Sequence, residues 1–167
     1  MTSLPGPPRL AQLLDEFYRE KLTALLRHEE GARAVSQYDF NNTYQYIVNR
    51  EETQLSWVAA ALAELGAAPP QVAAANRAIA GRGPEAARAV LEDDARDAQA
   101  FVDRWRPRVD AMTNARHAKM LLVILGEVLE QKRFFEQALA GRTDLLGRRA
   151  DVLEPASGEV LPTRWIE

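Results

Sequence analysis

The stretch from Tyr44 to Gly66, YQYIVNREETQLSWVAAALAELG, carries the clearest structural signal in this sequence. Its apolar residues recur at steps of three and four, the spacing that places side chains on one face of an α-helix. The acidic Glu51 lies on that apolar face. The pattern ends at Leu65, and Gly66 follows in the position where glycine commonly ends a helix. The stretch therefore predicts a long amphipathic helix with a carboxylate on its buried side.

Three further segments show the same periodicity and predict three more long helices, over about residues 9–38, 84–107 and 115–140. A polar break at residues 39–43 is expected to separate the first helix from the second and to cap the second. Pro84 suits the first turn of the third helix, and Pro107 is expected to end or kink it. Thr113 or Asn114 is expected to cap the fourth helix. Four long helices and almost no strand pattern indicate an all-α bundle.

The connection of residues 67–83 decides how the helices are joined. The sequence predicts one short helix within it, at about residues 72–79. Its 17 residues, counting both ends, could reach over about 50 Å when extended, whereas a helix of about 23 residues is only about 35 Å long. The link can therefore run the full length of the bundle. Because the other two connections are short, we expect an antiparallel four-helix bundle with one long crossover, the arrangement of ferritin-like folds.

The length of 167 residues is that of a single domain. We expect a bundle domain over residues 1–141 and a C-terminal extension over residues 142–167 that packs on it. Within the extension, the sequence is compatible with a short helix at residues 144–153 or with a small hairpin at residues 152–161.

Charge and composition exclude several classes of function. The 24 acidic and 21 basic residues give a net charge of -3, which argues against a dedicated nucleic-acid-binding protein. No apolar run reaches the roughly 18 residues of a membrane span, and the first ten residues lack the features of a signal peptide, so a cytoplasmic location is expected. With no cysteine there is no disulfide or thiolate metal site. No phosphate-binding glycine loop, GxSxG or HExxH motif occurs, so no catalytic residue is predicted.

The segment from Glu51 to Gly66 resembles the second helix of the ferritin-like superfamily, which includes the rubrerythrin and bacterioferritin types. In that family an acidic residue precedes a histidine by three positions, and a Leu-Gly end follows about three turns later. Here Glu51 stands at the acidic position, Gln54 replaces the histidine, and Leu65 with Gly66 forms the end. The resemblance covers about residues 9–139 and implies the ferritin-like four-helix fold.

Two other helices contribute to the same resemblance. The first carries an acidic residue, Glu29 or Glu30, followed by small residues. The fourth contains LGEVLEQKRFF, residues 125–135, which is similar to the family's second Glu-x-x-His region. If Glu130 is the acid there, Arg133 stands at the histidine position. Glu127 competes with Glu130 for the acidic role.

Counting residues along the predicted helices, without reference to any family, places acidic side chains from all four helices at one level. Glu30 and Glu51 lie equally far from the first turn. Asp94 and Glu130 lie within about 5 Å of the same height, at about 1.5 Å per residue. Glu92 shares the height but lies off the apolar face, so we interpret it as facing solvent. Carboxylates that gather in a low-dielectric interior must bind cations, pair with arginine or take up protons.

The resemblance implies that these carboxylates hold two iron or manganese ions, through one Glu from each of two helices and Glu-x-x-His from the other two. The implied metal-site residues are Glu30, Glu51, Gln54, Asp94 and Glu130. Gln54 can supply only a carbonyl oxygen. Arg133 cannot bind a metal and would neutralise an acid directly.

Two functions follow as hypotheses. The first is a ferritin-like bundle that has lost diiron chemistry and acts as a binding or assembly module, for an unidentified small molecule or as a homodimer through one helix face. The second is a carboxylate-bridged diiron or dimanganese protein that acts as an oxidase or peroxidase or handles iron. The chain has two histidines, His28 and His117. His28 adjoins Glu29 and could turn toward the site, but both histidines are interpreted as structural or surface residues.

Overall fold

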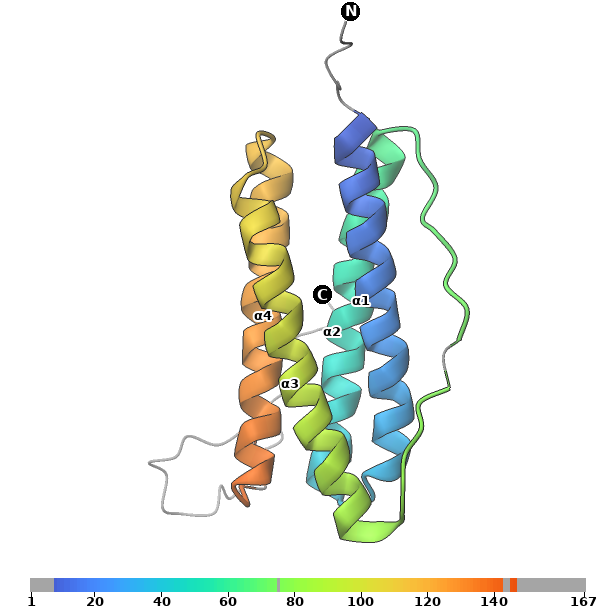
Figure 1. Cartoon of the computed structure of the whole chain (residues 1–167), viewed down its shortest axis with the longest axis vertical. Coiled ribbons are helices and arrows are strands. Elements are labelled where there is room, and N and C mark those ends of the chain that lie inside the picture. The colour runs from blue at the N-terminus through green and yellow to red at the C-terminus, as the bar shows by residue number, and fades with distance from the viewer. Residues whose placement is uncertain (1–7, 75, 143–144, 147–167) are drawn as a thin grey trace, which may run out of the picture.

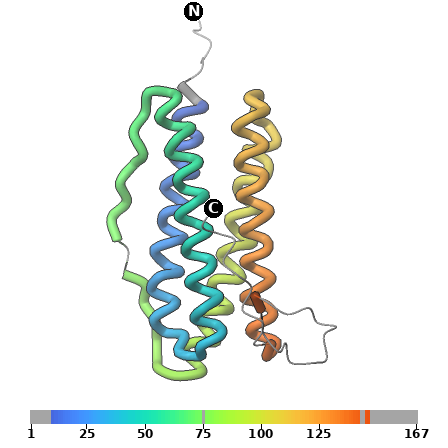
Figure 2. Tube along the Cα trace, turned by 180° about the vertical axis from the view of Figure 1, so that it is seen from behind, coloured from blue at the N-terminus to red at the C-terminus, as the bar shows by residue number. Residues whose placement is uncertain are grey.

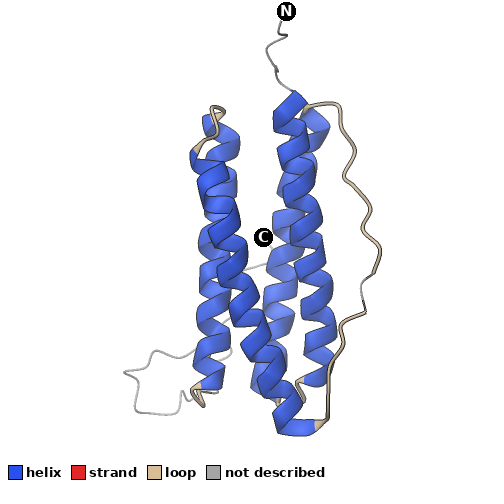
Figure 3. Ribbon diagram, in the orientation of Figure 1, coloured by secondary structure: helices blue, strands red, loops and turns tan. Residues whose placement is uncertain are grey.

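The computed structural model describes residues 8–74, 76–142 and 145–146. These residues form four α-helices and contain no strand (Figures 1 and 3). The helices are α1 (Pro8–Ala34), α2 (Tyr38–Glu64), α3 (Gly83–Asp110) and α4 (Ala115–Leu139). The predicted all-helical, four-helix architecture is confirmed. Apart from residues 145 and 146, which form a turn, the residues of the short helix or hairpin predicted at 144–161 lie outside the described part of the chain, as does nearly all of the predicted C-terminal extension.

The predicted break at residues 39–43 is wrong, because these residues already belong to α2. Gln37 caps the helix instead, and its side chain accepts a hydrogen bond of 2.8 Å from the backbone N–H of Phe40. Asn41 faces back to α1, where its Nδ2 donates to the carbonyl oxygens of Ala32 at 2.9 Å and Val35 at 3.3 Å. The polar residues here satisfy the ends of two helices, so they need no loop of their own.

The other helix ends follow the sequence more closely. Asn114 caps α4 by accepting a hydrogen bond of 3.1 Å from the backbone N–H of His117, which decides between the two caps that the sequence allowed. Pro107 does not end α3, which continues to Asp110.

None of the described helices has the length and hydropathy that a membrane span requires.

The short helix predicted at residues 72–79 is absent, since none of residues 67–74 and 76–82 is helical. This link runs along the outside of the bundle, from the end of α2 to the start of α3 at the opposite end (Figures 1 and 2). The 27 residues of α2 measure about 40 Å, whereas a helical link of 18 residues would measure only about 27 Å. The distance that the link must cover therefore favours extended backbone.

The four helices associate as two close pairs, α1 with α2 and α3 with α4, and the pairs meet through α1 against α3 and α2 against α4. One apolar cluster, which includes Phe17, Leu62 and Trp105, fills the end of the bundle where α1 begins. A second cluster, which includes Ile47 and Phe135, fills the other end. Buried polar residues from every helix lie between the two clusters.

Candidate functional site

We call the polar residues between the two apolar clusters the buried polar layer. They come from all four helices: Lys21 and His28 from α1, Glu51 and Gln54 from α2, Asp94 from α3 and Gln131 from α4. Each is less than a tenth exposed. Burial of so many polar groups is costly unless they bind one another, so the partners of each group decide what the layer can do.

Glu51 is fully buried, and two basic side chains from α1 face both of its oxygens. Nζ of Lys21 donates to Oε1 at 2.7 Å, and Nδ1 of His28 lies 2.8 Å from Oε2. Lys21 is itself only 1% exposed, so this ion pair is shielded from water. The prediction that Glu51 points into the bundle is confirmed, and its charge is compensated by the protein itself.

Asp94 is the second buried carboxylate, and it also has two donors. The hydroxyl of Tyr44 donates to Oδ2 at 2.6 Å, and Nη1 of Arg77 lies 2.9 Å from Oδ1. Nε2 of His28 faces the same oxygen at 4.0 Å, which is too long for a hydrogen bond. His28 thus lies between the two carboxylates and binds Glu51 directly.

Arg77 reaches this position from the link between α2 and α3, although most of the link is exposed. Its side chain is 3% exposed, and besides Asp94 it binds the carbonyl oxygens of Arg27 at 2.9 Å and Val90 at 3.3 Å. The backbone N–H of Arg77 donates to the carboxylate of Glu30. Glu30 therefore holds the link in place at the edge of the layer and does not join the central carboxylates.

A glycine on α1 leaves room for Arg77. A Cβ at Gly31 would lie 2.8 Å from Nη1 of Arg77, 3.0 Å from Cγ1 of Val90 and 3.4 Å from Oδ2 of Asp94. The first distance is shorter than any ordinary contact, so a side chain at position 31 must displace the guanidinium or shift the helix.

We expect Gly31→Ala to destabilise the protein by about 1–3 kcal/mol, the usual cost of overpacking a well-filled interior. Gly126→Ala is the matched control, because Gly126 also lies inside a helix and a Cβ there meets nothing within 4 Å. That substitution is expected to stabilise the protein by about 0.5–1 kcal/mol through helix propensity. Urea unfolding of the three proteins measures both changes, and stabilisation by Gly31→Ala would contradict the packing of Arg77.

The sequence leaves Glu127 and Glu130 open as the acid of α4, and Glu130, the one assigned to the metal site, does not face the layer. Glu130 is about half exposed and lies 3.9 Å from the exposed Arg133, so neither residue enters the layer. Glu127 faces α2 instead, where its carboxylate accepts hydrogen bonds from Gln54 and Arg50. The buried face of α4 includes Val128, Gln131 and Phe135, and residues 130 and 133 lie outside it. Counting residues gives a position along the helix axis but not the direction in which each side chain faces.

The sequence does not predict Lys21 or Gln131 of the layer, nor Arg77 beside it, and it gives His28 too little weight. Lys21 recurs in helical register with the apolar residues Leu14 and Phe17, and a lysine on an apolar face was a signal that could have been used. His28 was interpreted as structural or surface, although it lies seven residues after Lys21 on the same face. Nothing in the local sequence distinguishes Arg77 from its exposed neighbours.

The contacts of the layer set the protonation of its members. Burial alone would raise the pKa of Glu51, but the positive charges of His28 and Lys21 and their hydrogen bonds outweigh it and lower the pKa from 4.5 to about 2. Burial opposes the charged form of His28, yet Glu51 and Asp94 raise its pKa above the ordinary value of 6.5. The pKa of Tyr44 is raised well above 10.0 by burial and by the charge of Asp94.

We expect an NMR titration to find the pKa of His28 above 6.5, with His28→Gln to identify its resonances among the two histidines. Because the folded pKa is raised, the stabilisation by His28 is fully present below 6.5 and is lost as pH rises through the folded value. Glu51 behaves oppositely: its contribution is present above pH 4.5 and is lost as pH falls towards 2. A pKa of His28 below 6.5 would contradict the network.

The residues present do not fit a pair of bound metal ions. Both oxygens of Glu51 and both oxygens of Asp94 already face donors from the protein, and a cationic Lys21 or Arg77 repels a metal from the same place. In the described part of the chain, no group of three or more His, Asp and Glu side chains could hold a metal ion. Gln54 is bound to Glu127, and Glu130 faces outward.

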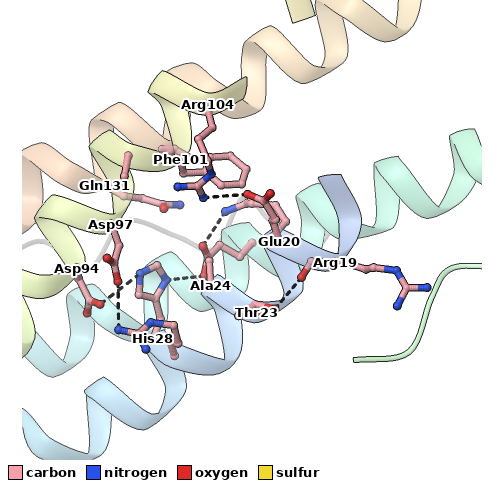
Figure 4. A pocket seen from close by; sticks show the side chains of 16 residues that line it. Arg19, Glu20, Thr23, Ala24, His28, Asp94, Asp97, Phe101, Arg104 and Gln131 are labelled. Atoms are coloured by element: carbon pink, nitrogen blue, oxygen red, sulfur yellow. Dashed lines mark hydrogen bonds and ion pairs between the residues drawn. The ribbon is translucent and has the colours of Figure 1, made fainter. Parts of the chain in front are cut away.

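A cavity of about 290 Å³ opens beside the layer, between α1 and α3 (Figure 4). Small and apolar side chains form part of its wall, and the layer residues Lys21, His28, Glu51, Asp94 and Gln131 form its inner part. Two ion pairs cross from α1 to α3 at its rim: Arg27 with Asp97 at 3.1 Å and Glu20 with Arg104 at 2.9 Å. The two pairs are separated by seven residues on each helix, about 10 Å.

One donor in the wall of the cavity has no partner. Nε2 of Gln131 is buried and makes no hydrogen bond, while the residue as a whole is 4% exposed. An unsatisfied buried amide N–H costs about 1–3 kcal/mol, so an acceptor that entered the cavity would be favoured.

Comparison with protein-family models, with curated proteins and with solved structures finds no match to this chain.

Proposed function

We propose that this chain is a ferritin-like bundle without diiron chemistry and that it acts as a binding module for a small molecule. The antiparallel order of helices and the long crossover between α2 and α3 belong to this proposal. They are supported by the two short connections and by the link that runs the length of the bundle (Figure 1). The sequence resemblance around Glu51 supports the same fold.

The observation that carries the proposal is that the protein compensates its buried carboxylates with its own cations and still leaves an open cavity beside them. Lys21 and His28 bind Glu51, and Arg77 binds Asp94. These basic groups neutralise the buried carboxylates, as metal ions do in diiron proteins. The cavity is close to the lower end of the size range of ligand pockets, about 300 Å³. Its mixed wall can orient a ligand through polar groups and hold it through apolar ones.

We expect at least one six-carbon probe from the set hexanoate, hexylamine, hexanol and hexanamide to bind the wild-type protein in calorimetry or ligand-observed NMR. Ala24→Leu should abolish this binding, because Ala24 lines the cavity and a larger side chain would fill it. Ala60→Leu adds the same atoms at an exposed position of α2 and should leave binding unchanged. Binding that survives Ala24→Leu, or no binding of any probe, would contradict the proposal.

Metal analysis tests the other part of the proposal. Protein purified from cells supplied with iron and manganese is expected to contain far less than one metal ion per chain. Near-stoichiometric metal that is lost in Glu51→Ala would show that the diiron alternative is correct.

A further inference from the structure

The cationic side chains around the cavity outnumber the anionic side chains by one when His28 is protonated. Its wall contains four anionic side chains, Glu20, Glu51, Asp94 and Asp97. Each has its own lysine or arginine partner within 3.1 Å, in the pairs Glu20–Arg104, Glu51–Lys21, Asp94–Arg77 and Asp97–Arg27. Arg19, also in the wall, pairs with Asp15 at 2.6 Å. His28 is therefore the additional cation whenever it is protonated.

Two nitrogen atoms of residues that line the cavity have no hydrogen-bond partner in the described part of the protein, and the one on His28 is a donor when the ring is protonated. Nε2 of Gln131 has no partner. His28 uses Nδ1 for Glu51, and its Nε2 lies 4.0 Å from the nearest oxygen of Asp94, beyond hydrogen-bond distance. Both oxygens of Asp94 already have other partners, the hydroxyl of Tyr44 and the guanidinium of Arg77. Two donors with one surplus positive charge complement a group with two acceptor oxygens and one negative charge.

The rest of the wall is suited to an apolar group of modest size. Ala24 of α1 and Ala98 and Phe101 of α3 line the cavity, together with Val128 of α4. In Figure 4, Phe101 of α3 and Gln131 of α4 both lie on the side of the cavity opposite α1. The volume of about 290 Å³ admits a short chain or a single ring and excludes a long lipid chain.

We propose that the cavity binds a small monocarboxylate, whose carboxylate accepts hydrogen bonds from Gln131 Nε2 and His28 Nε2 and whose apolar end packs against Ala24, Ala98 and Phe101. This proposal rests on the proposed binding function and names its ligand class. A carboxylate with a short apolar tail can accept a hydrogen bond from Nε2 of Gln131 and neutralise the positive charge of His28, whereas a protonated amine can do neither.

The same geometry makes binding depend on pH. His28 faces Lys21 on its own helix, Glu51 and Tyr44 on α2, and Asp94 on α3. Arg77 of the link binds the same Asp94, and from α4 His28 meets the uncharged ring of Phe135. Because the pKa of His28 is raised above 6.5, affinity for a carboxylate is highest below the pKa of His28 and falls as pH rises through it. The ligand itself stays ionised over this range.

The test is calorimetric titration with hexanoate, hexanol, hexanamide and hexylamine at pH 6.0 and pH 9.0. At pH 6.0 hexanoate is expected to bind at least about tenfold more tightly than the other three, and only its affinity should fall at pH 9.0. Gln131→Met should weaken hexanoate binding by about tenfold or more, since it removes a donor to a charged acceptor. Gln137→Met makes the same change on α4 outside the cavity wall and should alter affinity by less than about twofold.

The outcomes separate this proposal from the one on which it rests. Hexanol or hexylamine that binds as well as hexanoate, and is blocked by Ala24→Leu, overturns the carboxylate class and keeps the binding function. Hexanoate binding that is insensitive to both Gln131→Met and His28→Gln overturns the assigned contacts. Failure of all four probes overturns both proposals.

Discussion

Lys21→Met is expected to lower the free energy of unfolding by about 3–5 kcal/mol, the range observed when one partner of a buried ion pair is removed. Lys21 and Glu51 are 1% and 0% exposed, and their charged atoms lie 2.7 Å apart. Methionine keeps the length and apolar contacts of the lysine side chain, so the loss reports the charge. Glu51 would keep only His28 as its cationic partner.

The measurement is urea unfolding at pH 7, with Lys132→Met as the matched control. Lys132 pairs with Glu136 at 3.1 Å on the surface of α4, where such pairs contribute less than about 1 kcal/mol. NMR adds a second readout, because the charge of Lys21 lowers the pKa of His28. In Lys21→Met the pKa of His28 should rise further. A loss as small as that of the control, or an unmoved pKa, would show that Lys21 acts through packing alone.

Arg77→Met is expected to cost a similar amount, about 3–5 kcal/mol, for the same electrostatic reason. Asp94 is 1% exposed and would retain the hydroxyl of Tyr44 as its hydrogen-bond partner, with Nε2 of His28 at 4.0 Å. The substitution also removes two hydrogen bonds to backbone carbonyl oxygens, at Arg27 and Val90. The link between α2 and α3 would lose its main anchor to the bundle.

Hydrogen exchange provides the readout that distinguishes anchoring from a general loss of stability. In Arg77→Met, the backbone amide of residue 77, which donates to Glu30, should exchange faster at conditions where the helices remain protected. Arg82→Met is the control, because Arg82 lies in the same link with an exposed side chain and makes no side-chain capping bond. Equal exchange in both variants would contradict the role of Arg77 as the anchor.

The local sequence was sufficient to predict the four helices and the burial of two central acids, Glu51 and Asp94. Helical periodicity depends on neighbours three and four positions apart, so the burial of Glu51 and Asp94 could be read from the apolar faces on which they lie. The cap at Asn114 follows from the same local chemistry. The polar residues from Asp39 to Thr43 were misassigned to a break because polar side chains serve helix ends and loops equally well.

Only the tertiary structure decided which groups compensate those acids. Successive residues are rotated by about 100° around a helix axis, so matching heights could not tell that Glu127 and not Glu130 turns towards α2. The pairing of Lys21 and His28 with Glu51 depends on how α1 and α2 face each other. Arg77 arrives through an extended link, whose path no local pattern specifies. Contacts between distant segments depend on packing, which is why the chemistry of the interior emerges only in three dimensions.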